Sequence, residues 1–198
     1  MFKVCEIRAS ALLQENWIGQ EDFLLYGVSD PEAPEDHTLI FVKGALAESC
    51  GQVRNSIFIT KEGLELSLAA SSIQLQSSSP KNLYGELLER IVRMLPEADQ
   101  HMVNGSCVSR DVKMVRDVKI APFCVIGRDV VIGDRCEIGA GTVIRDHVRI
   151  GDDVIIREGC LVGVEDEDIY RLENGACRTL PHLAGTVIED GCLLLAGA

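Results

Sequence analysis

The sequence has few aromatic residues, few basic residues for its acidic ones, and no long hydrophobic run. Aromatic side chains make up 5% of the 198 residues, and 19 Lys and Arg stand against 31 Asp and Glu, for a net charge of −12 at pH 7. Binding to nucleic acid or to an anionic membrane surface depends on basic side chains, so this balance argues against both partners. No window approaches the roughly 18 apolar residues of a membrane span, and we expect no membrane insertion.

The eight cysteines include no Cys-x-x-Cys pair, so the chain has neither a zinc knuckle nor a thioredoxin-type motif. No apolar secretion segment precedes Trp17, which with the cysteine content indicates a reducing, cytoplasmic location. The four histidines do not stand at the spacing of a zinc site, so we expect no metal: His37, His101, His147 and His182. Phosphate-loop, nucleophile-elbow and dinucleotide-binding motifs are absent as well.

Residues 1–95 read as a small α/β domain. Short β-prone runs occupy residues 23–28, 38–42, 56–60 and 72–76. Short helices are predicted at residues 45–50 and 64–70. A longer helix begins at Ser79-Pro80, with serine as a candidate cap and proline at the first helical position, and ends at Pro96. Residues 96–105 are read as a linker.

After residue 105 the dominant period is six residues. Every sixth residue from position 108 to position 162 is apolar: Val108, Met114, Ile120, Ile126, Ile132, Ile138, Ile144, Ile150, Ile156 and Val162. A repeat at fixed period indicates stacked units that share one core. Three six-residue sides close a triangular coil, so residues 106–198 are predicted to form a parallel β-helix of hexapeptide repeats.

Small residues and glycines complete this pattern. Cys124, Cys136 and Cys160 fall two residues before an apolar position, and we expect them to pack inside the coils. Glycine often follows the apolar residue, as at Gly127 and Gly133, where we expect it to relieve the backbone at a bend. The repeat is interrupted at residues 164–185, because Ile188 lies 26 residues after Val162, which is not a multiple of six. We interpret this segment as an inserted loop. It could form a binding face or be a solvated surface loop.

Acyl transfer requires a general base with a pKa near neutral, which favours histidine. His147 lies within the repeat and is expected to project outward from a corner, and His182 lies in the insertion. Either could be the catalytic base or a surface residue. Arg145 and Arg149 are among the cations of the repeat region. They form a solvated face by default, or a binding surface for an acidic acyl donor such as an acyl carrier protein or coenzyme A.

These features together resemble the UDP-3-O-acylglucosamine N-acyltransferases of lipid A biosynthesis over nearly the whole chain. The similar stretches are residues 25–42, 56–60, 78–94, 145–151 and 161–190. The resemblance implies a left-handed β-helix, a homotrimer, and transfer of an acyl chain from acyl carrier protein to the amine of a UDP-amino-sugar. No bound cofactor is implied. It places Phe41 at one of two aromatic positions that hold uracil in the first domain.

Other readings remain open. Lys43 to Ala47 replace the segment that carries the family's second aromatic ring, and the family's catalytic histidine falls on a coil after Ala198. We therefore expect little N-acyltransferase activity from this chain alone. One alternative is a noncatalytic or truncated β-helical module that binds a nucleotide sugar or assembles with a longer partner. Another is a sugar O-acetyltransferase that uses acetyl-coenzyme A, which leaves the first domain unexplained.

Overall fold

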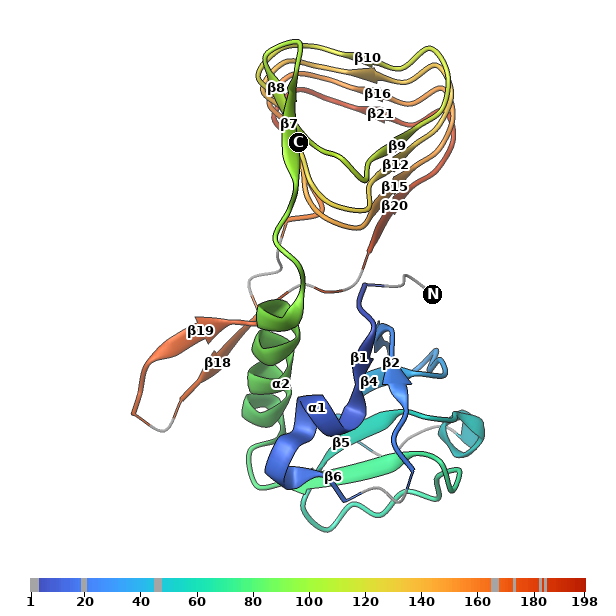
Figure 1. Ribbon diagram of the computed structural model, residues 1–198, viewed down its shortest axis with the longest axis vertical. Coiled ribbons are helices and arrows are strands. Elements are labelled where there is room, and N and C mark those ends of the chain that lie inside the picture. The colour runs from blue at the N-terminus through green and yellow to red at the C-terminus, as the bar shows by residue number, and fades with distance from the viewer. Residues whose placement is uncertain are drawn as a thin grey trace. The chain divides into compact units, whose positions relative to one another are not determined.

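The computed structural model describes residues 4–18, 21–44, 48–164, 168–172, 174–181, 183 and 185–198 (Figure 1). Contacts divide the chain into two units, which we describe separately. The first unit comprises residues 1–96 and 165–184, and the second comprises residues 97–164 and 185–198. The segment predicted as a loop inserted in the β-helix is therefore grouped by its contacts with the first unit.

The first unit is built on a parallel sheet of four strands in the order β3-β4-β5-β6. Its strands are β3 (Gly27–Ser29), β4 (Thr38–Phe41), β5 (Ile57–Lys61) and β6 (Ile73–Ser77), close to the predicted runs. Two short strands, β1 (Ile7–Arg8) and β2 (Leu24–Leu25), form an antiparallel pair. Successive residues of β5 are buried on alternate faces, so both faces of the sheet are covered.

One face of the sheet is covered by helices. These are α1 (Ala9–Leu13), the 3-10 turn η1 (Gln14–Asn16) and α2 (Pro80–Met94). Helix α2 begins at the predicted proline, although the Ser79 side chain makes no capping hydrogen bond. The prediction of a helix at 64–70 is wrong, since these residues have no helical hydrogen bonds, and residues 48–52 form the 3-10 turn η2 (Glu48–Gln52). Among the described residues, no helix has the length and apolar character to span a membrane.

The insertion adds an antiparallel hairpin to the first unit. Strand β18 (Ile169–Arg171) pairs with β19 (Cys177–Thr179), and β18 lies against α2. Leu183 is buried in the same apolar cluster as α1, α2 and the central strands, and Leu180 packs against that cluster. The core of the first unit is thus completed by residues from far along the chain.

The second unit consists of short parallel strands stacked in three sheets, as in a β-helix (Figure 1). The first sheet, which we call face C, contains β7 (Gln100–Val103), β8 (Ser106–Ser109), β11 (Val125–Ile126), β14 (Val143–Ile144) and β17 (Leu161–Val162). Face D contains β9 (Lys113–Met114), β12 (Val131–Ile132), β15 (Val148–Ile150) and β20 (Thr186–Ile188). Face E contains β10 (Lys119–Ile120), β13 (Glu137–Ile138), β16 (Ile155–Ile156) and β21 (Leu193–Leu194). Strand β7, within the predicted linker, extends face C as an antiparallel neighbour of β8.

The register between coils confirms the period of six. Residues paired across parallel strands are 18 apart, as for Ile126 with Ile144 and Ile132 with Ile150. Pairs that span the insertion are 38 apart, as for Ile150 with Ile188. The extra 20 residues equal the length of segment 165–184, so the fourth coil resumes in register after the insertion.

The inward positions form the core of this unit. Cys124, Cys136 and Cys160 are buried there as predicted, beside the aliphatic series. The left-handed backbone conformation recurs at every sixth residue from Asp117 to Gly159. The glycines after the aliphatic residues do not occupy these positions, since only Gly163 among them has a positive φ. The expected reason for these glycines is therefore wrong: at Gly127 an added Cβ would lie 2.3 Å from Oδ1 of Asp146.

Candidate functional site

The first candidate site lies at the carboxyl-terminal edge of the parallel sheet in the first unit. Phe41 ends β4, and its ring stacks on that of Tyr84, with centroids 5.3 Å apart and planes at 19°. Lys43 Nζ lies 5.9 Å from the Phe41 centroid. Ligands of open α/β sheets bind beyond the carboxyl ends of the strands, where these residues lie. We call Asp30, Phe41, Lys43 and Tyr84 the aromatic edge.

Tyr84 is a residue that the sequence analysis missed. Strands β4 and β6 run parallel, and α2 begins just after β6, so the first turns of α2 return to the edge where β4 ends. That geometry is the signal that could have found Tyr84. Burial, and secondarily the charge of Asp30, raise the pKa of Tyr84 to about 12. The phenol therefore remains protonated at neutral pH and can donate a hydrogen bond.

The close Phe41–Tyr84 contact changes the expected mode of base binding. The resemblance implies that uracil lies between two rings, but Phe41 and Tyr84 already stack on each other at 5.3 Å. That separation is within the range of direct aromatic contact, so no base fits between them. A base would instead stack on an outer face of this pair.

The second candidate site is a corner of the second unit, between faces C and D. His147 Nδ1 lies 3.3 Å from Oδ2 of Asp129, the residue one coil earlier. Arg149 donates to the same carboxylate oxygen from 2.8 Å and also to the backbone oxygen of Asp129. We call Asp129, His147 and Arg149 the corner triad. A carboxylate on Nδ1 fixes the orientation of an imidazole, which a general base requires.

The exposure of His147 differs from the expectation. The sequence predicts that it projects outward, but only 6% of the residue is exposed. Its backbone adopts the left-handed conformation at φ 61°, and the side chain lies along the stack toward Asp129. The repeat position fixes the corner but not whether a side chain points away from the coils or along them.

Electrostatics at this corner favour ionised Asp129. Burial raises the pKa of its carboxyl, but hydrogen bonds from Arg149 and His147 outweigh burial and place the pKa below the usual value. Arg149 is thus held by Asp129. Arg145 is exposed and forms no ion pair with any residue in the described part of the chain.

His37 and His182 are two of the remaining histidines. His182 lies outside the described residues. His37 hydrogen-bonds through Nδ1 to the Leu24 carbonyl and through Nε2 to Asn55, which makes it a structural turn residue. Within the described ranges, no group of three or more His, Cys, Asp or Glu side chains could hold a metal ion.

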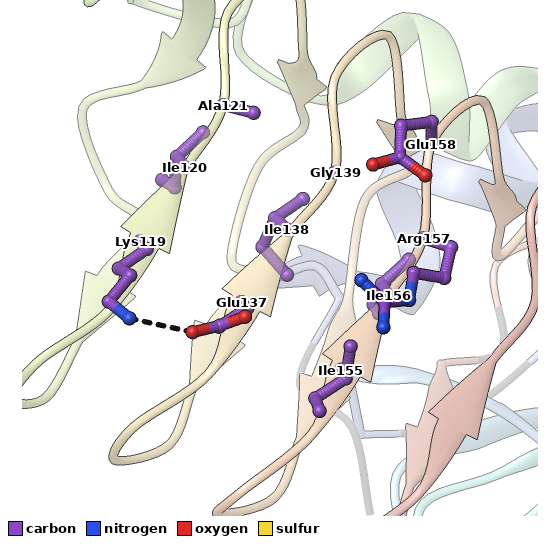
Figure 2. A pocket seen from close by; sticks show the side chains of 10 residues that line it. All are labelled: Lys119, Ile120, Ala121, Glu137, Ile138, Gly139, Ile155, Ile156, Arg157 and Glu158. Carbon is purple, nitrogen blue, oxygen red and sulfur yellow. Dashed lines mark hydrogen bonds and ion pairs between the residues drawn. The ribbon is translucent and has the colours of Figure 1, made fainter.

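A shallow hollow of about 280 Å³ lies on face E (Figure 2). Lys119 Nζ lies 2.6 Å from Oε1 of Glu137. Figure 2 shows this pair joining neighbouring strands, with Arg157 and Glu158 lining the hollow on the next coil. Its lining holds no histidine or cysteine, and none of the site residues selected from the sequence contributes to it. The hollow therefore offers no base of the kind expected for acyl transfer.

Comparison with known proteins identifies the repeats. Residues 111–146 match the family described as "Bacterial transferase hexapeptide (six repeats)". The match begins after β8 and includes β9 to β14, where the strands pair at the 18-residue register. No curated protein gives a significant match to the chain. The matched segment thus carries the hexapeptide repeats of bacterial transferases, within a stack of parallel strands.

Proposed function

We propose that the protein transfers an acyl chain to the amine of a UDP-amino-sugar, with an acyl carrier protein as donor. The hexapeptide repeats support acyl transfer as the reaction class. The proposal of a nucleotide-sugar substrate rests on the Phe41–Tyr84 stack at the carboxyl edge of a parallel sheet. An aromatic face there offers a uracil base a stacking surface, with Lys43 as a cation for the diphosphate.

In this proposal the corner triad supplies the base. The sugar amine attacks the carbonyl carbon of the acyl thioester, the C–N bond forms, and the C–S bond breaks. His147 takes the proton from the nitrogen and returns it to the departing thiolate, while Asp129 stabilises the imidazolium. Because His147 is buried, the corner must open for the amine to reach it. Arg145 and Arg149 attract the acidic carrier, and His182 is the second candidate base.

We further propose a left-handed coil and a homotrimer assembled through face C. The outward positions of this face carry no charge, and they include Met102, Cys107, Val125, Val143 and Leu161. The outward positions of faces D and E include Lys113, Arg149, Lys119 and Glu137. Phe123, which is 77% exposed in a left-handed corner conformation, adjoins face C. An uncharged flat sheet is the surface best suited to contact its own copies.

A second candidate is a noncatalytic module that binds a nucleotide sugar. The burial of His147, and the attachment of Arg149 to Asp129, favour it because both are features of a structural ion network. The aromatic edge would then bind ligand without turnover. An O-acetyltransferase using acetyl-coenzyme A leaves the aromatic edge without a role.

Binding and turnover separate these candidates. We expect UDP-N-acetylglucosamine to raise the melting temperature, since a ligand that binds only the folded state stabilises it. Phe41→Leu keeps apolar bulk but removes the ring face, and should weaken binding roughly 5- to 150-fold, because stacking contributes about 1–3 kcal/mol. Arg54→Ala, an exposed change just before β5 at the opposite edge of the sheet, is the control. Unchanged binding by Phe41→Leu would remove the nucleotide-sugar proposal.

Turnover is then measured with acyl carrier protein and a UDP-amino-sugar. Activity that falls about 10²- to 10⁴-fold in His147→Ala would support the corner triad as the base. Binding without measurable transfer in the parent chain would support the noncatalytic module instead. Transfer that survives in His147→Ala but not in His182→Ala would assign the base to the insertion.

A further inference from the structure

The β18–β19 hairpin meets helix α2 along one face of that helix. The contacting helix residues are Lys81, Asn82, Gly85 and Glu89. Lys81, Gly85 and Glu89 are spaced four apart, and Asn82 lies three before Gly85, so they share one side of the helix. Lys81 pairs with Asp168, and Asn82 Nδ2 donates to the Arg171 carbonyl oxygen at 2.6 Å. These polar contacts hold the first strand of the hairpin at its two ends.

In the middle of the interface, the ring of Tyr170 packs against the helix at Gly85. Tyr170 is 3% exposed, and a Cβ added at Gly85 would lie 2.7–2.8 Å from three of its ring atoms. Glycine inside a helix is unfavourable relative to alanine. Gly85 does not have a positive φ, so the position requires glycine for space. Glycine at this position lowers the stability of α2 but leaves room for the Tyr170 ring.

The end of the interface converges on one carboxylate. Glu89 accepts a hydrogen bond from the Tyr170 hydroxyl at 2.5 Å, from Arg178 at 3.1 Å and from Arg93 at 3.0 Å. The bond from Tyr170 has the largest effect and, with Arg178 and Arg93, holds the pKa of Glu89 below its usual value against the effect of burial. Burial and the bond to Glu89 raise the pKa of Tyr170 to about 12. Tyr170 therefore remains a donor whenever Glu89 is ionised.

The rest of the hairpin contributes little burial. Ile169 is 51% exposed, and Cys177 to Thr179 are all exposed. Docking thus depends on one buried ring and on a few polar contacts, the kind of interface that opens locally before the core does. Leu183 and Leu180, which follow the hairpin, are held in or against the core and remain anchored when the hairpin opens.

We propose that the β18–β19 hairpin is a releasable strap, docked on α2 while Glu89 is ionised and detached when that carboxylate is neutralised. Neutral Glu89 loses its ionic bonds to Arg178 and Arg93 and most of its attraction for the Tyr170 hydroxyl. Glu86, which also faces Tyr170 electrostatically, makes no hydrogen bond to any described residue of the hairpin and cannot substitute. The strap concerns how the first unit holds the insertion and does not depend on the proposed transfer reaction.

The pH dependence follows from the lowered pKa. Glu89 has a lower pKa in the docked state than in the released state. Its stabilisation of docking is therefore complete at pH values above the released-state pKa, and is lost as the pH falls through the docked-state pKa. Hydrogen exchange of the hairpin amides, corrected for the intrinsic pH effect, should accelerate over that range. The Glu89→Gln variant should exchange faster than the parent at neutral pH and depend less on pH, with the Lys81–Asp168 pair left to respond to acid.

Trypsin provides the direct test, because Arg171 and Arg178 lie in the hairpin itself. We expect Glu89→Gln and Gly85→Ala to increase cleavage after these two residues on the order of tenfold, since local opening controls proteolysis. Glu86→Gln removes a neighbouring carboxylate from the same helix and should cleave like the parent. The intact core in each variant is verified by the fluorescence of Trp17.

A double variant separates release from misfolding. In a Tyr170→Ala background the space beside Gly85 is empty, so Gly85→Ala should no longer increase cleavage and should stabilise α2 through its better helix propensity. Cleavage of Glu89→Gln and Gly85→Ala at the parent rate would overturn the proposal. So would an equal effect of Gly85→Ala with and without the Tyr170 ring.

Discussion

The carboxylate of Asp146 accepts a hydrogen bond from the backbone N–H of Arg128, 2.8 Å away and one coil earlier. Gly127 lies directly against this carboxylate, since a Cβ there would be 2.3 Å from the same oxygen, whereas Val115 stands at the equivalent position beside the contact of Arg116 N–H with Asp134. Asp152 reaches the amide of Asp134 beside Gly133, and Asp190 reaches the amide of Asp152 beside Gly151. Glycine and aspartate in successive coils thus form one repeated unit.

The first prediction concerns this unit. Gly127→Ala should lower the free energy of unfolding by about 1–3 kcal/mol, because the added methyl displaces the carboxylate and leaves an amide unpaired. Urea denaturation followed by circular dichroism measures the change. Gly141→Asn is the control, since no heavy atom lies within 4 Å of a Cβ there and asparagine tolerates its φ of +71°. Equal stability of Gly127→Ala and the parent would show that the glycine is not needed for the contact.

Much of the second unit could be predicted from the sequence because its structure is periodic. Each inward residue meets its counterpart 18 residues later, so one pattern fixes strand, face and burial together. The insertion was detectable by the same arithmetic, since Ile188 falls out of the six-residue phase. The repeat does not determine the direction of a corner side chain. For that reason His147 was predicted to project outward, whereas it is buried.

The contacts of the insertion could not be predicted because they join residues about 80 positions apart. Nothing near Gly85 in the sequence indicates that its missing side chain accommodates the ring of Tyr170. The hydrogen bonds of Glu89 to Tyr170 and Arg178 are equally nonlocal. The aromatic edge was partly predicted: Phe41 from the resemblance, but its partner Tyr84 only from the return of α2 to the sheet edge.

The second prediction tests whether the insertion completes the core of the first unit. Leu183→Ala should destabilise that unit by about 2–5 kcal/mol, as for other large-to-small changes at buried leucines. Trp17 is the single tryptophan and packs against the same cluster, so its fluorescence in urea reports the change. Ile169→Ala, at a half-exposed position of the same insertion, should shift the midpoint little. A parent-like midpoint for Leu183→Ala would mean that residues 1–96 hold their core unaided.

The third prediction tests face C as the assembly surface. Leu161→Lys should dissociate the proposed trimer, because it places a charge in an uncharged sheet face. Val187→Lys is closely matched, since Leu161 is 55% and Val187 53% exposed and both are outward aliphatic residues, the latter on face D. Sedimentation velocity at micromolar concentration measures the mass. A monomeric parent near 21.6 kDa would refute the trimer, and dissociation by Val187→Lys alone would move the interface to face D.

The last prediction concerns Asp129, whose hydrogen bonds from Arg149 and His147 place its pKa below the usual value despite burial. A carboxyl with a lowered folded-state pKa contributes stability above its unfolded pKa and loses it as the pH falls through the folded value. Asp129→Asn is nearly isosteric with the protonated acid. It should therefore be about 1–2 kcal/mol less stable than the parent at pH 7, and the difference should shrink toward zero in acid.

Urea midpoints at pH 7, 5 and 3 would measure that convergence. Asp117→Asn is the control, because Asp117 has the same left-handed corner conformation and accepts no hydrogen bond from a described side chain. A difference for Asp129→Asn that stays constant with pH would show that the ionised carboxylate does not stabilise the corner. If the stability difference converges and acyl transfer falls in step with loss of the carboxylate, then Asp129 acts through His147. If transfer is unaffected, the corner triad is structural and the base must be sought elsewhere in the chain.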